Sequence, residues 1–180
     1  MKKTIWTFGL IAGAVLSLMM VLTMPFVDQI GFESAMWLGY TSMVAAFLAI
    51  YFGIRSYRDN VRGGTISFGR AAALGMLIAT VATLCYVATW QVMYRTAYQD
   101  FWPKWTAYEI DKARSNGKSE AELEKIRADG VKYGEMYKNP LINSAFTFLE
   151  TMPVALIITL VSAATLSRRK RLPGEAAASA

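Results

Sequence analysis

The chain has 180 residues, of which 54% are hydrophobic, and a formal net charge of +6. It contains no histidine and one cysteine, Cys85, so zinc clusters, Cys/His nucleophile pairs, Ser/His/Asp triads and an internal disulfide are all excluded. The basic residues form short groups that flank hydrophobic stretches instead of one basic face, which argues against nucleic-acid binding.

Four stretches are long and apolar enough to cross a bilayer as helices. Three have no charged side chain and the fourth has one, Glu150. Because about 20 apolar residues span the hydrocarbon core, the sequence predicts an all-α polytopic membrane protein with one transmembrane domain, residues 1–172, and a disordered tail, residues 173–180. The expected spans are 5–27, 34–54, 71–94 and 144–166.

The first stretch follows Lys2 and Lys3, so a cleaved signal peptide is the alternative to a retained span. Its uncharged run is longer than the 7–15 residues of a signal-peptide core. Residues 22–26 offer no small-residue cleavage site. We therefore expect this stretch to remain as the first transmembrane helix.

Small residues recur along one face of the first three spans, where they allow another helix to approach closely. The pattern does not separate packing within one bundle from dimerisation, and packing within the bundle is the interpretation we favour. The residues concerned are Gly9, Gly13 and Ser17, then Ala45, Ala49 and Gly53, then Ala71, Gly75 and Ala79.

Basic groups predict the orientation through the positive-inside rule. They precede the first span, join the second to the third and follow the fourth, whereas the first connection carries only Asp28 and Glu33. Both termini are therefore expected in the cytoplasm, with the insertion 95–143 outside. The expected lipid-headgroup contacts are Arg55, Arg58, Arg62, Arg70, Arg168, Arg169, Lys170 and Arg171.

The insertion has the signals of a helical hairpin. Pro103 can begin a helix, Ser115-Asn116-Gly117 is typical of a turn, and Ser119 with Glu122 forms a capping box that opens a second helix. The second helix carries an apolar stripe, which we expect to rest on the ends of the spans: Leu123, Ile126, Tyr133 and Tyr137.

Aromatic residues crowd the junction between the third span and this hairpin. Because Trp and Tyr concentrate at the depth of the lipid headgroups, an interfacial belt is the favoured interpretation, and a stacking site for an aromatic or sugar ligand is the alternative. The residues are Trp90, Tyr94, Tyr98, Phe101, Trp102 and Trp105.

Glu150 is the one residue that can carry chemistry inside the membrane, where a carboxylate costs free energy. Three positions later, Pro153 leaves the Leu149 carbonyl without its helical donor. Two interpretations stay open: a proton or cation site, or a structural carboxylate near a helix N-terminus that pairs with a neighbouring arginine. The candidate partners are Gln91, Tyr94 and Arg95.

Three motifs follow one another along the chain. They are the basic loop Gly63-Gly64-x-Ile66-Ser67-Phe68-x-x-Ala71 with Gly75, the outer segment ending in Asn139-Pro140, and Phe146-x-Phe148-Leu149-Glu150-x-x-Pro153. In this order they resemble the bacterial membrane proteins grouped as domain of unknown function 4199, over residues 1–172. The resemblance implies four membrane helices, an extracytoplasmic insertion between the third and fourth, and Glu150 and Pro153 as family features. It implies no activity.

The expected function is therefore non-enzymatic, with no catalytic residue, cofactor or metal ligand predicted. The leading hypothesis is an inner-membrane protein that acts through contacts with the lipid bilayer or with a protein partner, either another copy of itself or an envelope protein. The alternative is a small proton-coupled transporter that uses Glu150, assembled as an oligomer because four spans rarely enclose a pathway. No substrate can be named.

Overall fold

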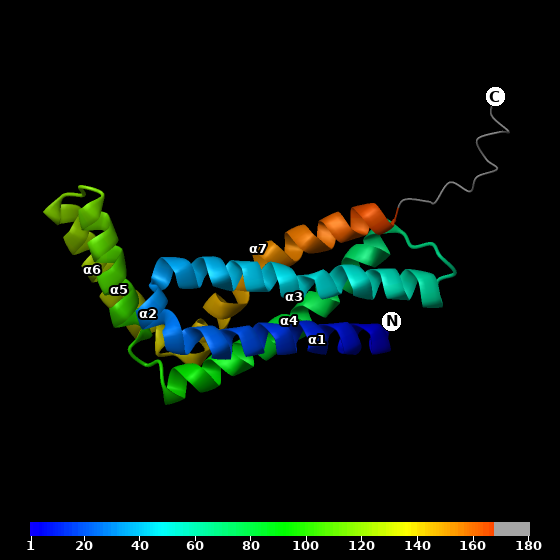
Figure 1. Ribbon diagram of the computed structural model, residues 1–180, viewed down its shortest axis with the longest axis horizontal. Helices are drawn as coiled ribbons and strands as arrows, with labels where there is room; N and C mark the ends of the chain where they lie inside the picture. Colours follow the sequence, from blue (N-terminus) through cyan, green and yellow to red (C-terminus); the bar gives the residue numbers. More distant parts are fainter. Residues whose placement is uncertain (168–180) are drawn as a thin grey trace, which may run out of the picture.

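The computed structural model describes residues 1–167, and each secondary-structure element within them is a helix. The tail 173–180 and the basic group Arg168, Arg169, Lys170 and Arg171 lie outside the described residues. In chain order the elements are α1 (Lys2–Thr23), η1 (Met24–Phe26), α2 (Val27–Ile30), α3 (Phe32–Val61), α4 (Phe68–Thr96), α5 (Phe101–Ser115), α6 (Glu120–Tyr137) and α7 (Pro140–Leu166) (Figure 1).

Four segments are long and apolar enough to cross a membrane: Lys2–Ile30, Phe32–Val61, Phe68–Thr96 and Pro140–Leu166. The predicted all-α fold with four such helices is confirmed. The helices run beyond the predicted spans, because backbone hydrogen bonding continues where the apolar run ends. Thus α3 remains helical through Arg55 and Arg58, and α7 begins at Pro140, not near Ser144.

The long helices lie side by side along the long axis of the molecule (Figure 1). Both α1 and α7 pack against α3 and α4, so α1 and α7 occupy opposite corners of a four-helix bundle. Large apolar side chains fill its centre, whereas many others remain exposed on its outside, a surface that suits lipid better than water. The fully buried centre includes Phe47, Ile50, Ile54, Leu74 and Ile78, and the exposed set includes Trp6, Leu18, Trp37, Leu84 and Ile157.

The glycine stripe of α1 lies against α4. A Cβ atom on Gly13 would lie 2.7 Å from the Cβ of Cys85, and one on Gly9 would lie 2.7 Å from the Cβ of Val81. Such distances are far inside van der Waals contact, so only glycine permits this helix spacing. The stripe is used within the bundle, which is the interpretation the sequence favoured.

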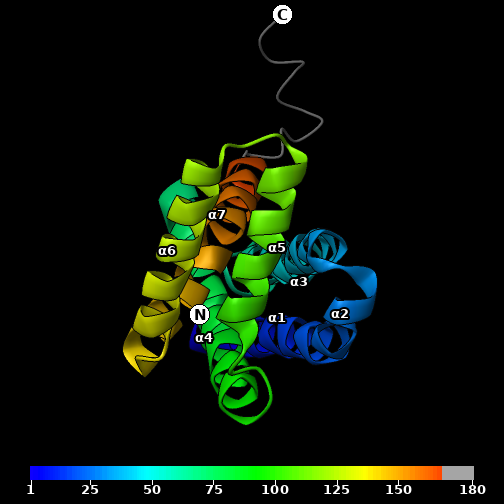
Figure 2. The same cartoon turned by 90° about the vertical axis from the view of Figure 1, so that its left-hand side faces the viewer.

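Helices α5 and α6 form a hairpin that lies across one end of the bundle (Figures 1 and 2). We call this the hairpin end; the opposite end, with the α3–α4 connection, is the loop end. The capping box is present: the Ser119 Oγ accepts from the Glu122 N–H, and the Glu122 carboxylate accepts from the Ser119 N–H at 2.9 Å. Helix α5 begins at Phe101, with Pro103 inside its first turn, where proline is tolerated.

The apolar stripe of α6 only partly meets the expectation that it rests on the bundle. Leu123 packs with Ile110 and Ala113 of α5, and Ile126 lies beside them. Only Tyr137, at the end of α6, enters the aromatic cluster of the bundle. Two amphipathic helices joined by a short turn cover each other's apolar faces first, so the hairpin has its own small core.

Candidate functional site: a cavity at the hairpin end

A cavity of about 450 Å³ lies at the hairpin end, within the size range of small-molecule sites. Residues from all eight helical elements contribute to its lining, and most of them are apolar or aromatic. The rings of Phe101, Trp102 and Trp105 come from α5, so the hairpin closes the cavity at the end of the bundle. This arrangement provides a largely apolar space that no single helix could supply.

Toward the loop end, α3 and α7 are in direct contact. There the Arg58 side chain donates to the Leu166 carbonyl at 3.3 Å. A Cβ on Gly75 of α4 would lie 3.0 Å from Ile50 of α3 and 2.8 Å from Thr159 of α7, so side chains of α3 and α7 converge on the same point. Helix α7 crosses α3 obliquely (Figure 1), which leaves the two helices separated at the hairpin end. The side of the bundle is therefore open at that level.

The position of the opening follows from which lining residues are exposed. Met36 and Tyr40 of α3 are exposed, as are Phe146 and Glu150 of α7, whereas the other lining residues are buried or partly buried. The cavity therefore opens sideways, between α3 and α7. In a bilayer this face of the bundle would meet lipid chains.

Glu150 lines the cavity, and no other lining residue carries a carboxylate. Within residues 1–167, no hydrogen bond or ion pair engages this carboxylate. Burial raises the pKa of the Tyr137 phenol, and the nearby negative charge of Glu150 also raises it. The acid thus faces an apolar and aromatic space with no positive group beside it.

The predicted partners of Glu150 are engaged elsewhere. Gln91 Nε2 donates to Asn143 Oδ1 at 2.8 Å and to Ser144 Oγ at 3.1 Å. The Tyr94 ring packs edge-on against Tyr137, with 5.3 Å between centroids. Neither residue lines the cavity.

The predicted pair between Arg95 and Glu150 is not among the ion pairs of the described part of the chain. The hydrogen bonds Thr83–Thr151 and Gln91–Asn143 fix an antiparallel register between α4 and α7. In that register Glu150 is level with residue 84, so Arg95 lies about 16 Å farther along the axis at 1.5 Å per residue. The pairing was wrong because α7 begins earlier than the apolar run, which places Glu150 deeper.

The second structural role suggested for Glu150, as a carboxylate at a helix N-terminus, also disagrees with the structure. Helix α7 begins at Pro140, so Glu150 lies about 15 Å from its start, whereas the helix dipole acts within the first turn. Pro153 is exposed and does not line the cavity. Glu150 therefore lies at the opening of the cavity, exposed on the outer side and lining the cavity on the inner side.

The aromatic residues at the junction pack against one another and cover the cavity at the hairpin end. Trp90 Nε1 donates to the Tyr137 hydroxyl at 2.7 Å, and both side chains are buried. The Phe101 ring lies edge-on to Trp90 at 5.3 Å, and the Trp102 ring lies edge-on to Tyr137 at 5.2 Å. The sequence predicted that most of these residues form one interfacial belt, but it did not predict that they line a cavity.

Two sets of lining residues were not singled out from the sequence. Tyr86 lies one helical turn before Trp90 on the same face of α4, and that spacing could have identified it. Five methionines also line the cavity: Met19, Met20, Met24, Met36 and Met43. Methionine is flexible and polarizable, so this lining adapts to apolar molecules of different shape.

The other predicted site residues lie at the loop end. Arg58 pairs with Asp59 at 2.7 Å, and Arg55 lies 3.7 Å from the same carboxylate. Arg62 and Arg70 line a second, smaller hollow beside the α3–α4 connection. Among residues 1–167, no group of three or more His, Cys, Asp or Glu side chains is arranged to hold a metal ion.

Comparisons with known proteins identify a family but no activity. A search of curated proteins found no match. A search of solved structures found no match either. The model of one family, described as "Protein of unknown function (DUF4199)", matches residues 7–168, and the chain therefore belongs to that family.

Proposed function

We propose that this protein is a non-enzymatic, multi-pass membrane protein that holds a lipid-like molecule in the hairpin-end cavity. The observation that carries the proposal is the sideways opening between α3 and α7, at Met36, Tyr40, Phe146 and Glu150. A cavity that opens toward the bilayer, and is covered at the bundle end by α5, exchanges its occupant with lipid more readily than with water.

The proposed location is the inner membrane of a bacterium, with both termini in the cytoplasm and the hairpin outside. The loop end supports this orientation, because Arg55, Arg58, Arg62 and Arg70 lie there near the N-terminus and the end of α7 (Figure 1). In this orientation these arginines would contact lipid phosphates on the cytoplasmic side.

Cysteine labelling tests the orientation. Ser119 lies at the exposed tip of the hairpin, so Ser119→Cys in a Cys85→Ser background is expected to react with a membrane-impermeant maleimide on intact cells. A cysteine at Asn60 in the same background is the matched control for the loop end, and it should react only after lysis. The reverse pattern would reject the proposed orientation.

A proton-coupled transporter, assembled as an oligomer, is the second candidate function. The unpaired Glu150 carboxylate in the cavity favours it. Within one chain, however, the loop-end half of the bundle is filled by side chains such as Phe47, Ile50 and Ile78, which are fully buried. Transport predicts a proton flux into proteoliposomes that Glu150→Gln abolishes, whereas a lipid-holding protein shows no such flux.

Filling the cavity tests the leading proposal. A Cβ atom on Gly39 would meet nothing within 4 Å, and Gly39 lines the cavity, so Gly39→Trp places an indole in the space that the ligand would take. Gly69, on α4 outside the cavity, is equally open and gives the matched control Gly69→Trp.

The readout is cross-linking to a lipid with a photoactivatable acyl chain. We expect the wild type and Gly69→Trp to be labelled on peptides covering residues 36–43 and 146–150. Gly39→Trp should lose that labelling while the outer faces of the helices remain labelled. Equal labelling of the cavity peptides in Gly39→Trp and Gly69→Trp would contradict the proposal.

A further inference from the structure

Building on the proposed function, we propose that the molecule held in the cavity is a lipid with an ammonium headgroup, for which the Glu150 carboxylate is the counter-ion. The proposal rests on three features of the cavity: an acid without a partner within residues 1–167, aromatic rings in the same lining, and an apolar remainder that opens to the side.

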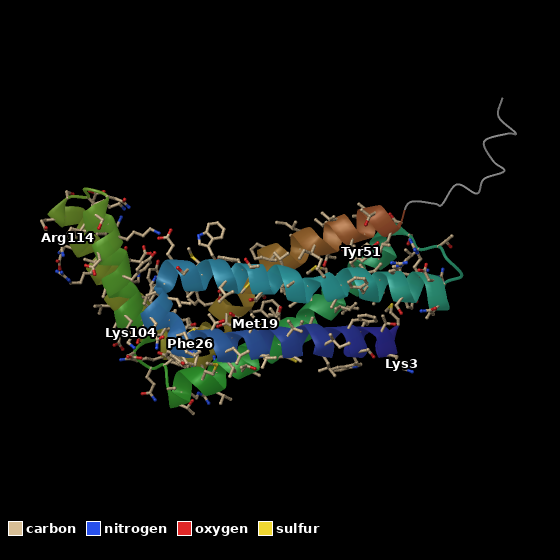
Figure 3. All side chains as sticks on the ribbon, in the orientation of Figure 1. Lys3, Met19, Phe26, Tyr51, Lys104 and Arg114 are labelled. Atoms are coloured by element: carbon tan, nitrogen blue, oxygen red, sulfur yellow. The ribbon has the colours of Figure 1, made fainter. Side chains whose placement is uncertain are left out.

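The charge of Glu150 calls for a positive group that the described part of the chain does not supply. Lys104 lies at the base of the hairpin (Figure 3), where it bonds Asp28 at 3.0 Å and Asp100 at 3.2 Å. Lys138 pairs with Glu135 at 2.6 Å. An unpaired carboxylate in an apolar space is costly, so a cationic ligand has more to gain here than a neutral or anionic one.

The rings that share the cavity with Glu150 favour the same ligand class. Tyr40 from α3, Tyr86 and Trp90 from α4 and Phe146 from α7 all contribute to the lining. Aromatic faces attract ammonium groups, and cages of several rings recognise quaternary ammonium ions. A carboxylate beside such rings matches an ammonium in charge, whereas a hydroxyl headgroup could donate a hydrogen bond to the acid but would leave its negative charge uncompensated.

The remainder of the cavity matches an acyl chain. Met19, Met20 and Met43 line the apolar part, and methionine side chains adapt to flexible apolar molecules. The opening between α3 and α7 lets a chain extend sideways, while the α5 rings cover the bundle end. This direction of opening selects a lipid over a small, water-soluble amine.

Two photoactivatable lipids with the same chains test the headgroup. One carries phosphoethanolamine and the other phosphoglycerol, so the phosphate is shared and only the ammonium is exchanged for hydroxyl groups. Each is added below saturation to the full-length protein in dodecyl maltoside micelles, and labelling of peptides 36–43 and 146–150 is quantified.

We expect the phosphoethanolamine probe to label the wild-type cavity peptides roughly tenfold more strongly than the phosphoglycerol probe does. A difference of that size is what one hydrogen bond to a charged group can contribute to binding. In Glu150→Gln the ratio of the two probes should fall close to one. The matched control is Glu135→Gln, which removes an exposed carboxylate outside the cavity and should keep the wild-type ratio.

The wild-type ratio remains informative even if Glu150→Gln fails to fold. Equal labelling of the cavity peptides by both probes would overturn the ammonium assignment and leave the lipid-holding function intact. No cavity labelling by either probe would overturn the lipid-holding function itself. A tenfold preference that persists in a folded Glu150→Gln would show that Glu150 is not the counter-ion.

Discussion

Gln91 of α4 and Asn143 of α7 are joined by a hydrogen bond of 2.8 Å between Nε2 and Oδ1. Asn143 is 1% exposed, and its own amide nitrogen donates to the Tyr137 carbonyl at 3.4 Å. With the Thr83–Thr151 bond of 2.9 Å nearer the loop end, this pair fixes the register of the two helices that carry Tyr86 and Glu150.

Replacing Asn143 with leucine should lower the free energy of unfolding. Interhelical hydrogen bonds in membrane proteins contribute about 0.6 kcal/mol on average and at most about 1.7 kcal/mol. The expected loss is near the lower figure, because Gln91 keeps Ser144 and the Pro140 carbonyl as acceptors. Titration with SDS in mixed micelles measures it. Asn60→Leu, at an exposed amide that bonds Ser56 of the same helix, should change nothing.

Tyr137→Phe should cost more than the Asn143 change. It removes the acceptor of the buried Trp90 Nε1–H, which then has no partner, and such an orphaned donor costs about 1–3 kcal/mol. The same SDS titration measures the loss, with Tyr133→Phe at an exposed position as the control. A loss no larger than that of Tyr133→Phe would mean that the Trp90–Tyr137 bond contributes nothing to stability.

Gly13→Leu should separate α1 from α4 and destabilise the bundle. Overpacking of this kind costs about 1–3 kcal/mol or more, because the added side chain would collide with Cys85. The better helix propensity of leucine acts in the opposite direction, by at most about 1 kcal/mol. Gly69→Leu, where a Cβ meets nothing within 4 Å, isolates that propensity effect and should be neutral or mildly stabilising in thermal unfolding.

The start of α6 should loosen in acid. Hydrogen bonds from the backbone and side chain of Ser119 hold the pKa of Glu122 below its ordinary value of 4.5. The capping box therefore contributes fully above pH 4.5, and this contribution is lost as the pH falls through the lowered pKa. Hydrogen exchange of the amides of residues 120–123, corrected for intrinsic rates, measures the loss between pH 6 and pH 3.

Two variants distinguish the loss of the capping box from acid unfolding of the whole protein. Glu122→Gln should remove most of this pH dependence at the start of α6. Glu124→Gln, which removes an exposed carboxylate that pairs with Arg127, should retain it. An identical acid response in both variants would show that the box does not control the opening of α6.

The sequence supplied much of the fold because its strongest signals are local. Uninterrupted apolar runs predicted four helices of membrane length, and Ser119 with Glu122 predicted where α6 begins. The ends of the spans were predicted less accurately: α6 ends just before Asn139-Pro140, as expected, but Pro140 also begins α7, ahead of the predicted start at residue 144. Charge and hydropathy mark where lipid ends, whereas backbone hydrogen bonding decides where a helix ends.

By itself, the sequence determined that Glu150 is the one acid within a long apolar run and that aromatic residues gather near the hairpin. Only the tertiary structure decided what surrounds that acid. The α4–α7 register moved it away from Arg95 and placed it in one cavity with Tyr86. The crossing of α7 over α3 opened that cavity to the side. Register and crossing angle depend on contacts between residues distant in the chain, and no local pattern encodes them.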